Sequence, residues 1–218
     1  AYVLPFAFYL LGTALIGQFD EGWYPLTYTA VVVAVIATRG WSLHRVELLR
    51  PHGRVVQGRV TGVIGIAIWI GLSHLRVEQG VSEWLPSWLR PAERVAFDPF
   101  TELSGLHVWW FIVVRLIGLS VVVPLAEELF WRGFLLRWLI DPDWEKVPIG
   151  KYTFASCMLV TGMFALAHPE WLAAAVYCLL INGLLYWTKD LWQCVVAHAT
   201  SNLLLGLYVL SFGQWWLW

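Results

Sequence analysis

The stretch from residue 106 to residue 140 reads LHVWWFIVVRLIGLSVVVPLAEELFWRGFLLRWLI, and it decides the fold class. Almost all of its residues are apolar, and it exceeds the about 20 residues that an α-helix needs to cross a bilayer. As one helix it would extend roughly 50 Å at 1.5 Å per residue, which is too long for a straight crossing. Pro124 cannot donate a backbone hydrogen bond to Ser120, and this predicts a kink at that point.

Six further apolar runs lie on either side of this stretch. They cover residues 2–19, 25–38, 55–75, 152–168, 171–188 and 191–210. The chain is 59% hydrophobic and only 13% charged, which leaves too little polar surface for a soluble domain. These patterns predict an all-α, polytopic transmembrane helix bundle with about seven spans. We expect one membrane domain over 1–218, with three spans and an outer loop in 1–105 and a four-span core in 106–210.

The charged residues indicate the orientation of the chain and exclude one class of partner. If every run crosses, eight basic residues face one side and three face the other. The eight are Arg39, Arg45, Arg50, Arg54, Arg137, Lys146, Lys151 and Lys189, and the three are Arg76, Arg90 and Arg94. Basic residues favour the cytoplasmic side, which predicts a cytoplasmic N-terminus. The net charge of -1 argues against a nucleic-acid partner, whereas the lipid bilayer is an expected one.

A charged or strongly polar side chain inside a bilayer is costly and needs a physical reason. Glu128 and Arg132 are four residues apart, so they share a helix face and can form an ion pair. Glu127 points about 100° away from Glu128 around the helix and lacks the arginine partner. This favours Glu127 as the reactive group. The alternative is a purely structural ion-pair network. Asn182 is expected to form an interhelical hydrogen bond, and Arg115 either reaches the outer interface or pairs with a carboxylate.

Two more pairs of residues repeat the helical spacing. Phe164 and His168 are four residues apart at the end of one run, and His198 and Asn202 are four apart in another. A single histidine in a membrane helix is usually a packing residue. Two histidines with a glutamate pair and an aligned asparagine instead indicate a site between the helices of the C-terminal core.

Taken in order, these three patterns, Glu-Glu-x-x-x-Arg, Phe-x-x-x-His and His-x-x-x-Asn, resemble the CPBP family of intramembrane peptidases. This family comprises the CAAX proteases and bacteriocin-processing enzymes, and the resemblance covers residues 106–210. The first three runs and the sequence DPDWEKVP at 141–148 also look like a bacterial subgroup labelled CAAX prenyl protease-related. The resemblance implies an integral protein of a bacterial inner membrane that acts on a membrane-associated peptide or protein.

The resemblance also implies roles for the matching residues. Glu127 and His168 would activate a water molecule for attack on the peptide carbonyl, and His198 and Asn202 would donate hydrogen bonds to the oxyanion. Glu128, Arg132 and Phe164 would support the site. The rival chemistry is a zinc ion held by Glu127, His168 and His198, although the motif H-E-x-x-H is absent. We favour the reading without a metal or another cofactor.

Functions other than proteolysis fit the same membrane-embedded residues. A transporter or proton relay could use buried carboxylates and histidines, but here the polar residues gather after Pro124 instead of in two repeated halves. A non-catalytic binding or immunity protein could keep the fold and capture a peptide without cutting it. The sequence therefore favours an intramembrane endopeptidase and leaves both alternatives open.

Overall fold

The computed structural model describes residues 2–16, 21–42, 49, 51–82, 84, 86 and 96–218, and the regular structure in these ranges is helical. The α-helices are α1 (Leu4–Ile16), α2 (Tyr24–Ser42), α3 (Val56–Leu75), α4 (Val77–Ser82), α5 (Pro99–Glu102), α6 (Leu106–Ile117), α7 (Val123–Glu128), α8 (Leu136–Trp138), α9 (Phe154–Leu166), α10 (Trp171–Thr188) and α11 (Leu191–Phe212). Four of the basic residues used for the orientation, Arg45, Arg50, Arg90 and Arg94, lie outside the described ranges.

Each of the seven predicted runs forms a helix. Four helical stretches are long and apolar enough to cross a membrane: Val56–Leu75, Leu106–Trp138, Trp171–Thr188 and Leu191–Phe212. Three shorter apolar helices accompany them: Leu4–Ile16, Tyr24–Thr38 and Phe154–Leu166. Large hydrophobic side chains such as Leu11, Leu166 and Trp187 are exposed on the outside of the bundle, which suits contact with lipid. The protein is therefore an integral membrane protein with a helical bundle fold.

The long stretch Leu106–Trp138 is one helical rod in which two π-helical segments interrupt the α-helix. The π-helical segment Gly118–Val122 separates α6 from α7, and a second one, Leu129–Leu135, separates α7 from α8. Pro124, where the sequence predicts a kink, is the second residue after the first segment. A π-helical turn bonds residues five apart and inserts one extra residue, so it rotates the side chains beyond it.

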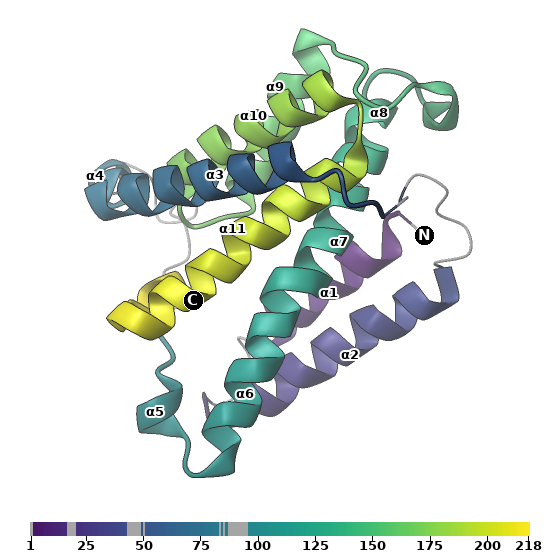
Figure 1. Cartoon of the computed structure of the whole chain (residues 1–218). Coiled ribbons are helices and arrows are strands. Elements are labelled where there is room, and N and C mark those ends of the chain that lie inside the picture. Colours follow the sequence, from purple (N-terminus) through teal and green to yellow (C-terminus); the bar gives the residue numbers. More distant parts are fainter. Residues whose placement is uncertain are drawn as a thin grey trace.

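Two groups of helices pack on the central pair formed by this rod and α11 (Figure 1). Helices α1 and α2 pair with each other and contact α7 and α6, respectively. Helices α3, α9 and α10 form the other group, in which α3 contacts both α10 and α11. The centre of the bundle is thus the place where the rod, α9, α10 and α11 meet.

Helix α3 approaches α10 and α11 closely because glycines line its inner face. A Cβ atom on Gly58 would lie 2.6 Å from the Gln193 carbonyl oxygen, and one on Gly62 would lie 2.5 Å from the Ala197 carbonyl oxygen. Small residues four apart are a common way for membrane helices to approach each other. This packing fixes α3 against the stretch of α11 that leads to His198.

Candidate active site

The glutamate pair lies in α7, and its two carboxylates have different surroundings. Arg132 Nη1 donates a hydrogen bond of 3.1 Å to Glu128 Oε1, and both side chains are fully buried. This confirms the ion pair that the four-residue spacing predicts. Glu127 is also buried, but its Oε2 atom has no hydrogen-bond partner in the described part of the chain. Glu128 Oε2 is likewise buried without a partner, so the difference lies in the ion pairs: Glu128 Oε1 is engaged by an arginine, whereas none of the ion pairs of the described residues includes Glu127.

Arg132 connects the rod to two neighbouring helices. Its Nε donates to Asn182 Oδ1 at 3.0 Å, and its Nη2 lies 3.4 Å from the Cys178 carbonyl oxygen, both on α10. Its guanidinium also lies over the Phe164 ring of α9, with 5.2 Å from Cζ to the ring centroid. The interhelical hydrogen bond predicted for Asn182 is therefore present. An almost saturated guanidinium of this kind holds its surroundings in place instead of reacting.

His198 contacts Glu128 directly, an arrangement that the spacing along one helix cannot predict. The His198 Nδ1 atom lies 2.8 Å from Glu128 Oε1, so one carboxylate oxygen faces both Arg132 and His198. The Tyr177 ring also contacts the imidazole edge to face, with 5.7 Å between the ring centroids. The Tyr177 hydroxyl donates to Ser201 Oγ at 3.0 Å. The orientation of His198 is therefore set by α7 and by α10.

His168 lies two residues after the end of α9 and is oriented by α9 and by α3. Its Nδ1 lies 2.8 Å from the Phe164 carbonyl oxygen, so Nδ1 is the donor and carries the proton. The imidazole stacks on the Phe164 ring at 4.5 Å and meets the edge of Trp69 at 5.7 Å. In this tautomer Nε2 is the nitrogen that can accept a proton, as a base requires. Phe164 thus touches both His168 and Arg132, which accounts for its place in the motif.

Asn202 fills a gap in the backbone hydrogen bonding of the rod. In the π-helical register, the Val123 N–H bonds to the Gly118 carbonyl oxygen. The next carbonyl, that of Leu119, would then need the N–H of Pro124, which proline lacks. Asn202 Nδ2 donates to the Leu119 carbonyl oxygen at 2.8 Å and replaces that bond. One amide hydrogen of Asn202 is used here, and the second is left for another acceptor.

The structure thus brings some of the predicted residues into direct contact with one another, whereas others bond only to the backbone of neighbouring segments. Glu128, Arg132 and His198 form a connected cluster, whereas His168 and Asn202 are oriented by backbone carbonyls of α9 and of the rod. Sequence reasoning missed Tyr177, Ser201 and the Leu119 carbonyl. Only the combination of Pro124 with an amide donor on a later helix could have predicted the contact with the Leu119 carbonyl.

The zinc alternative requires three ligands around one point. Among the described residues, no group of three or more His, Cys, Asp or Glu side chains is arranged to hold a metal ion. The proposed ligands Glu127, His168 and His198 therefore do not form a ready metal site in this conformation. Metal dependence stays open to measurement.

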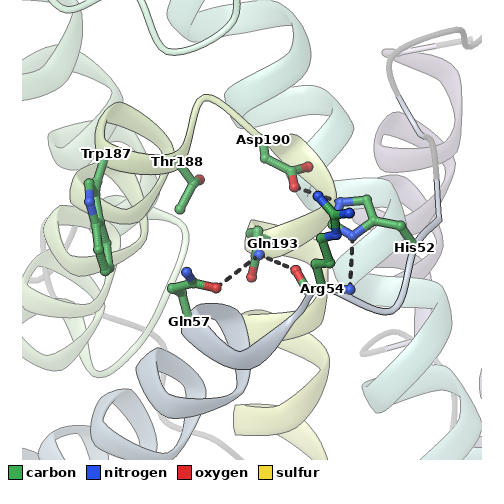
Figure 2. A pocket seen from close by; sticks show the side chains of 7 residues that line it. All are labelled: His52, Arg54, Gln57, Trp187, Thr188, Asp190 and Gln193. Carbon is green, nitrogen blue, oxygen red and sulfur yellow. Dashed lines mark hydrogen bonds and ion pairs between the residues drawn. The ribbon is translucent and has the colours of Figure 1, made fainter.

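A pocket of about 680 Å³ lies at the start of α11 and contains none of the predicted site residues (Figure 2). His52 Nε2 lies 2.7 Å from Asp190 Oδ2 on one wall. Gln193 donates to the Arg54 carbonyl and accepts from the Gly58 N–H, which anchors the segment before α3 to α11. These polar side chains are hydrogen-bonded to one another or to the backbone. The pocket therefore lies where the segment before α3 contacts α11, and it is not the candidate site.

Comparison with known proteins identifies a family for part of the chain. Residues 108–204 match a family model described as Type II CAAX prenyl endopeptidase Rce1-like. The match includes the seven motif residues from Glu127 to Asn202 and confirms the family that the three motifs predict. It leaves α1, α2 and α3 outside, and the bacterial subgroup stays a prediction. No curated protein and no solved structure showed a significant match to the chain.

Proposed function

We propose that this chain is an intramembrane endopeptidase. The premise is that residues 108–204 match the Rce1-like family of type II CAAX prenyl endopeptidases. The chain would hydrolyse a peptide bond in a membrane-associated protein or peptide. The observation that carries the proposal is the contrast within the glutamate pair. Glu128 Oε1 is engaged by Arg132 and His198, whereas none of the ion pairs of the described residues includes Glu127.

The reaction begins with a water molecule held by Glu127 and His168. As the water oxygen bonds to the peptide carbonyl carbon, a proton of the water passes to Glu127, and the carbonyl oxygen becomes an oxyanion. Breaking the carbon–nitrogen bond requires a proton on the leaving nitrogen, and protonated Glu127 supplies it. Glu127 returns to its carboxylate form, and the products are a new carboxylic acid group and a new amine, between which a proton then passes in neutral water.

The oxyanion is stabilised by hydrogen bonds from His198 and Asn202. With Nδ1 of His198 directed at Glu128, an imidazolium form presents its Nε2–H to the oxyanion. The amide hydrogen of Asn202 that does not bond to Leu119 is the second donor. Glu128 and Arg132 position His198, and Phe164 positions His168. Each proposed donor is thus held in position by a hydrogen bond to another group. Preorganised stabilisation of an oxyanion requires donors held in this way.

The direct test is cleavage by the purified full chain in lipid nanodiscs. The substrate is a library of short, N-terminally acylated peptides, and the products are read by mass spectrometry in ¹⁸O-labelled water. Hydrolysis places one ¹⁸O atom in the new carboxylate, and the Glu127→Gln variant is the matched control. A transporter or a non-catalytic binding protein would release no labelled fragment, and that result would contradict the proposal.

The proposed location is a bacterial inner membrane with the N-terminus in the cytoplasm. The basis is the distribution of basic residues, eight against three. A cysteine introduced beside Arg50 should be protected from an impermeant thiol reagent in intact cells, and one beside Glu93 should be labelled. The reverse labelling would overturn this orientation.

A further inference from the structure

The pocket at the start of α11 has a cation on its wall that the proposed reaction does not use. Arg54 lines this pocket, and it takes part in the local hydrogen bonding only through its backbone (Figure 2). Its N–H donates to His52 Nδ1 at 3.2 Å, and its carbonyl oxygen accepts from Gln193. Among the described residues, no hydrogen bond or ion pair involves its guanidinium. The side chain of Arg54 is therefore available to a ligand.

The carboxylate on the same wall, that of Asp190, already has a donor on each oxygen. Its Oδ1 accepts from the Trp192 N–H at 2.9 Å, and its Oδ2 lies 2.7 Å from His52 Nε2. Because His52 Nδ1 accepts the N–H of Arg54, Nδ1 carries no proton, and Nε2 is the donor to Asp190. The local hydrogen bonding thus uses this carboxylate and leaves the guanidinium aside.

The other polar groups of the pocket that lack partners are also donors. Gln57 Oε1 accepts from Gln193 Nε2 at 3.3 Å, which leaves the Gln57 amide hydrogens. Trp187 is 72% exposed at the end of α10, and its indole N–H can only donate. The Thr188 hydroxyl, in contrast, gives its hydrogen to the Leu184 carbonyl oxygen. A guanidinium, an amide and an indole N–H together suit an oxygen-rich anion, and a phosphate accepts from several donors at once.

The pocket lies at the level of the membrane surface. Helices α3 and α11 begin there, α10 ends there, and all three are long and apolar enough to span a bilayer. An exposed indole at the end of such a helix is typical of the headgroup region. Beside Gln57, an apolar strip begins on the outside of α3, with Val56, Val60 and Ile64 four residues apart and 68%, 53% and 48% exposed. A phosphate bound in the pocket would therefore have a path for acyl chains next to it.

We propose that Arg54, Gln57 and Trp187 form a site for the phosphate of a phospholipid headgroup, whose acyl chains follow the exposed strip of α3. The ligand would contact α3 and α10 at the place where Gln193 already anchors the segment before α3 to α11. It should thus stabilise the packing of these helices. The site contains none of the residues proposed to cleave a peptide, so the proposal does not depend on the protease.

The test measures lipid binding to the full-length protein in dodecyl maltoside by native mass spectrometry. The probes are dioleoyl-phosphatidylglycerol, dioleoylglycerol, which has the same chains without the phosphate, and glycerol 3-phosphate, which has the phosphate without the chains. The wild type should bind the phospholipid more tightly than either partial probe. Arg54→Gln should raise the Kd for the phospholipid about 10-fold, because one charge-assisted contact is lost. Arg54→Lys should restore part of the affinity. The matched control is Arg59→Gln, which changes an exposed arginine outside the pocket and should leave the Kd unchanged.

Thermal unfolding shows whether the variants fold, because the Arg54 side chain makes no bond that Arg54→Gln would break. Without lipid, this variant should unfold at the temperature of the wild type, and the phospholipid should stabilise the wild type more. Trp187→Phe removes only the indole N–H and should raise the Kd by a smaller factor, which provides a second variant. An equal Kd for the phospholipid in the wild type and in Arg54→Gln would overturn the site. Equally tight binding of dioleoylglycerol would assign it to acyl chains alone, and equally tight binding of glycerol 3-phosphate to a free phosphate. Either result would also overturn the proposal.

Discussion

Arg132 and Arg115 are two buried arginines on the same helical rod, and their surroundings differ in kind. Arg132 donates to a carboxylate, an amide oxygen and a backbone carbonyl. Arg115 meets two aromatic faces, and its Nε has no acceptor. Burial alone therefore does not reveal what a charged residue does in a membrane protein. The partners that the chain itself provides, oxygen atoms for one arginine and mainly aromatic rings for the other, separate the two.

The same contrast separates the two adjacent glutamates. Glu128 belongs to the hydrogen-bonded network of Arg132 and His198, whereas none of the ion pairs of the described residues includes Glu127. Networks with matched donors and acceptors stabilise a fold, and their disruption leaves buried charges without partners. Groups without partners contribute little to stability and remain available for substrate or water. Each variant below tests whether this division holds.

The largest effect is expected for the glutamate pair. Glu127→Gln keeps the shape of the side chain but cannot accept a proton, so peptide cleavage should fall by more than about 1,000-fold. Its thermal unfolding should remain close to that of the wild type. Glu128→Gln should instead lower the unfolding temperature, because Arg132 and His198 both lose a charged partner. Retained cleavage in Glu127→Gln together with loss in Glu128→Gln alone would reverse the assignment.

The two arginines should respond differently to the same substitution. Arg132→Met leaves Glu128 without its main counter-charge and should reduce the free energy of unfolding by about 3–5 kcal/mol. Arg115→Met removes a cation that has no counter-charge among the described residues, so the change should stay within about 1 kcal/mol or favour the folded state. Denaturant unfolding of both variants in one detergent gives the comparison. A similar loss in both would show that Arg115 is a structural residue.

His198 tests whether the site uses a metal. Without a metal, His198→Gln keeps an amide N–H near the oxyanion, and cleavage should fall about 100- to 1,000-fold without being abolished. Active wild type should then contain no stoichiometric metal by elemental analysis and should resist chelators. If Glu127, His168 and His198 bind zinc, active protein carries close to one zinc per chain, chelation silences it, and added zinc restores it. Zinc that tracks activity would exclude the metal-free mechanism.

The sequence predicts the local part of this site well and the long-range part poorly. The pairing of Glu128 with Arg132 follows from helical spacing, and the family follows from three motifs in order. The contact of His198 with Glu128 depends on how α11 packs against α7, which no spacing along one helix contains. The bond from Asn202 to Leu119 arises from a π-helical register next to a proline. The surroundings of Arg115 depend on α2 and the segment after α11, which lie outside the region of family similarity.

The smallest effect concerns two tyrosine hydroxyls, one on each side of the comparison. The Tyr177 hydroxyl donates to Ser201, and Ser201 Oγ in turn donates to the Gly62 carbonyl at 2.8 Å. Tyr177→Phe breaks this link between α10, α11 and α3 and should cost about 1 kcal/mol of unfolding free energy. The Tyr28 hydroxyl contacts the Arg115 guanidinium and has no second polar partner among the described residues, so Tyr28→Phe should cost less stability than Tyr177→Phe. A stability loss in Tyr28→Phe equal to that in Tyr177→Phe would mean that the cluster around Arg115 is already saturated, and the division between the two arginines would fail.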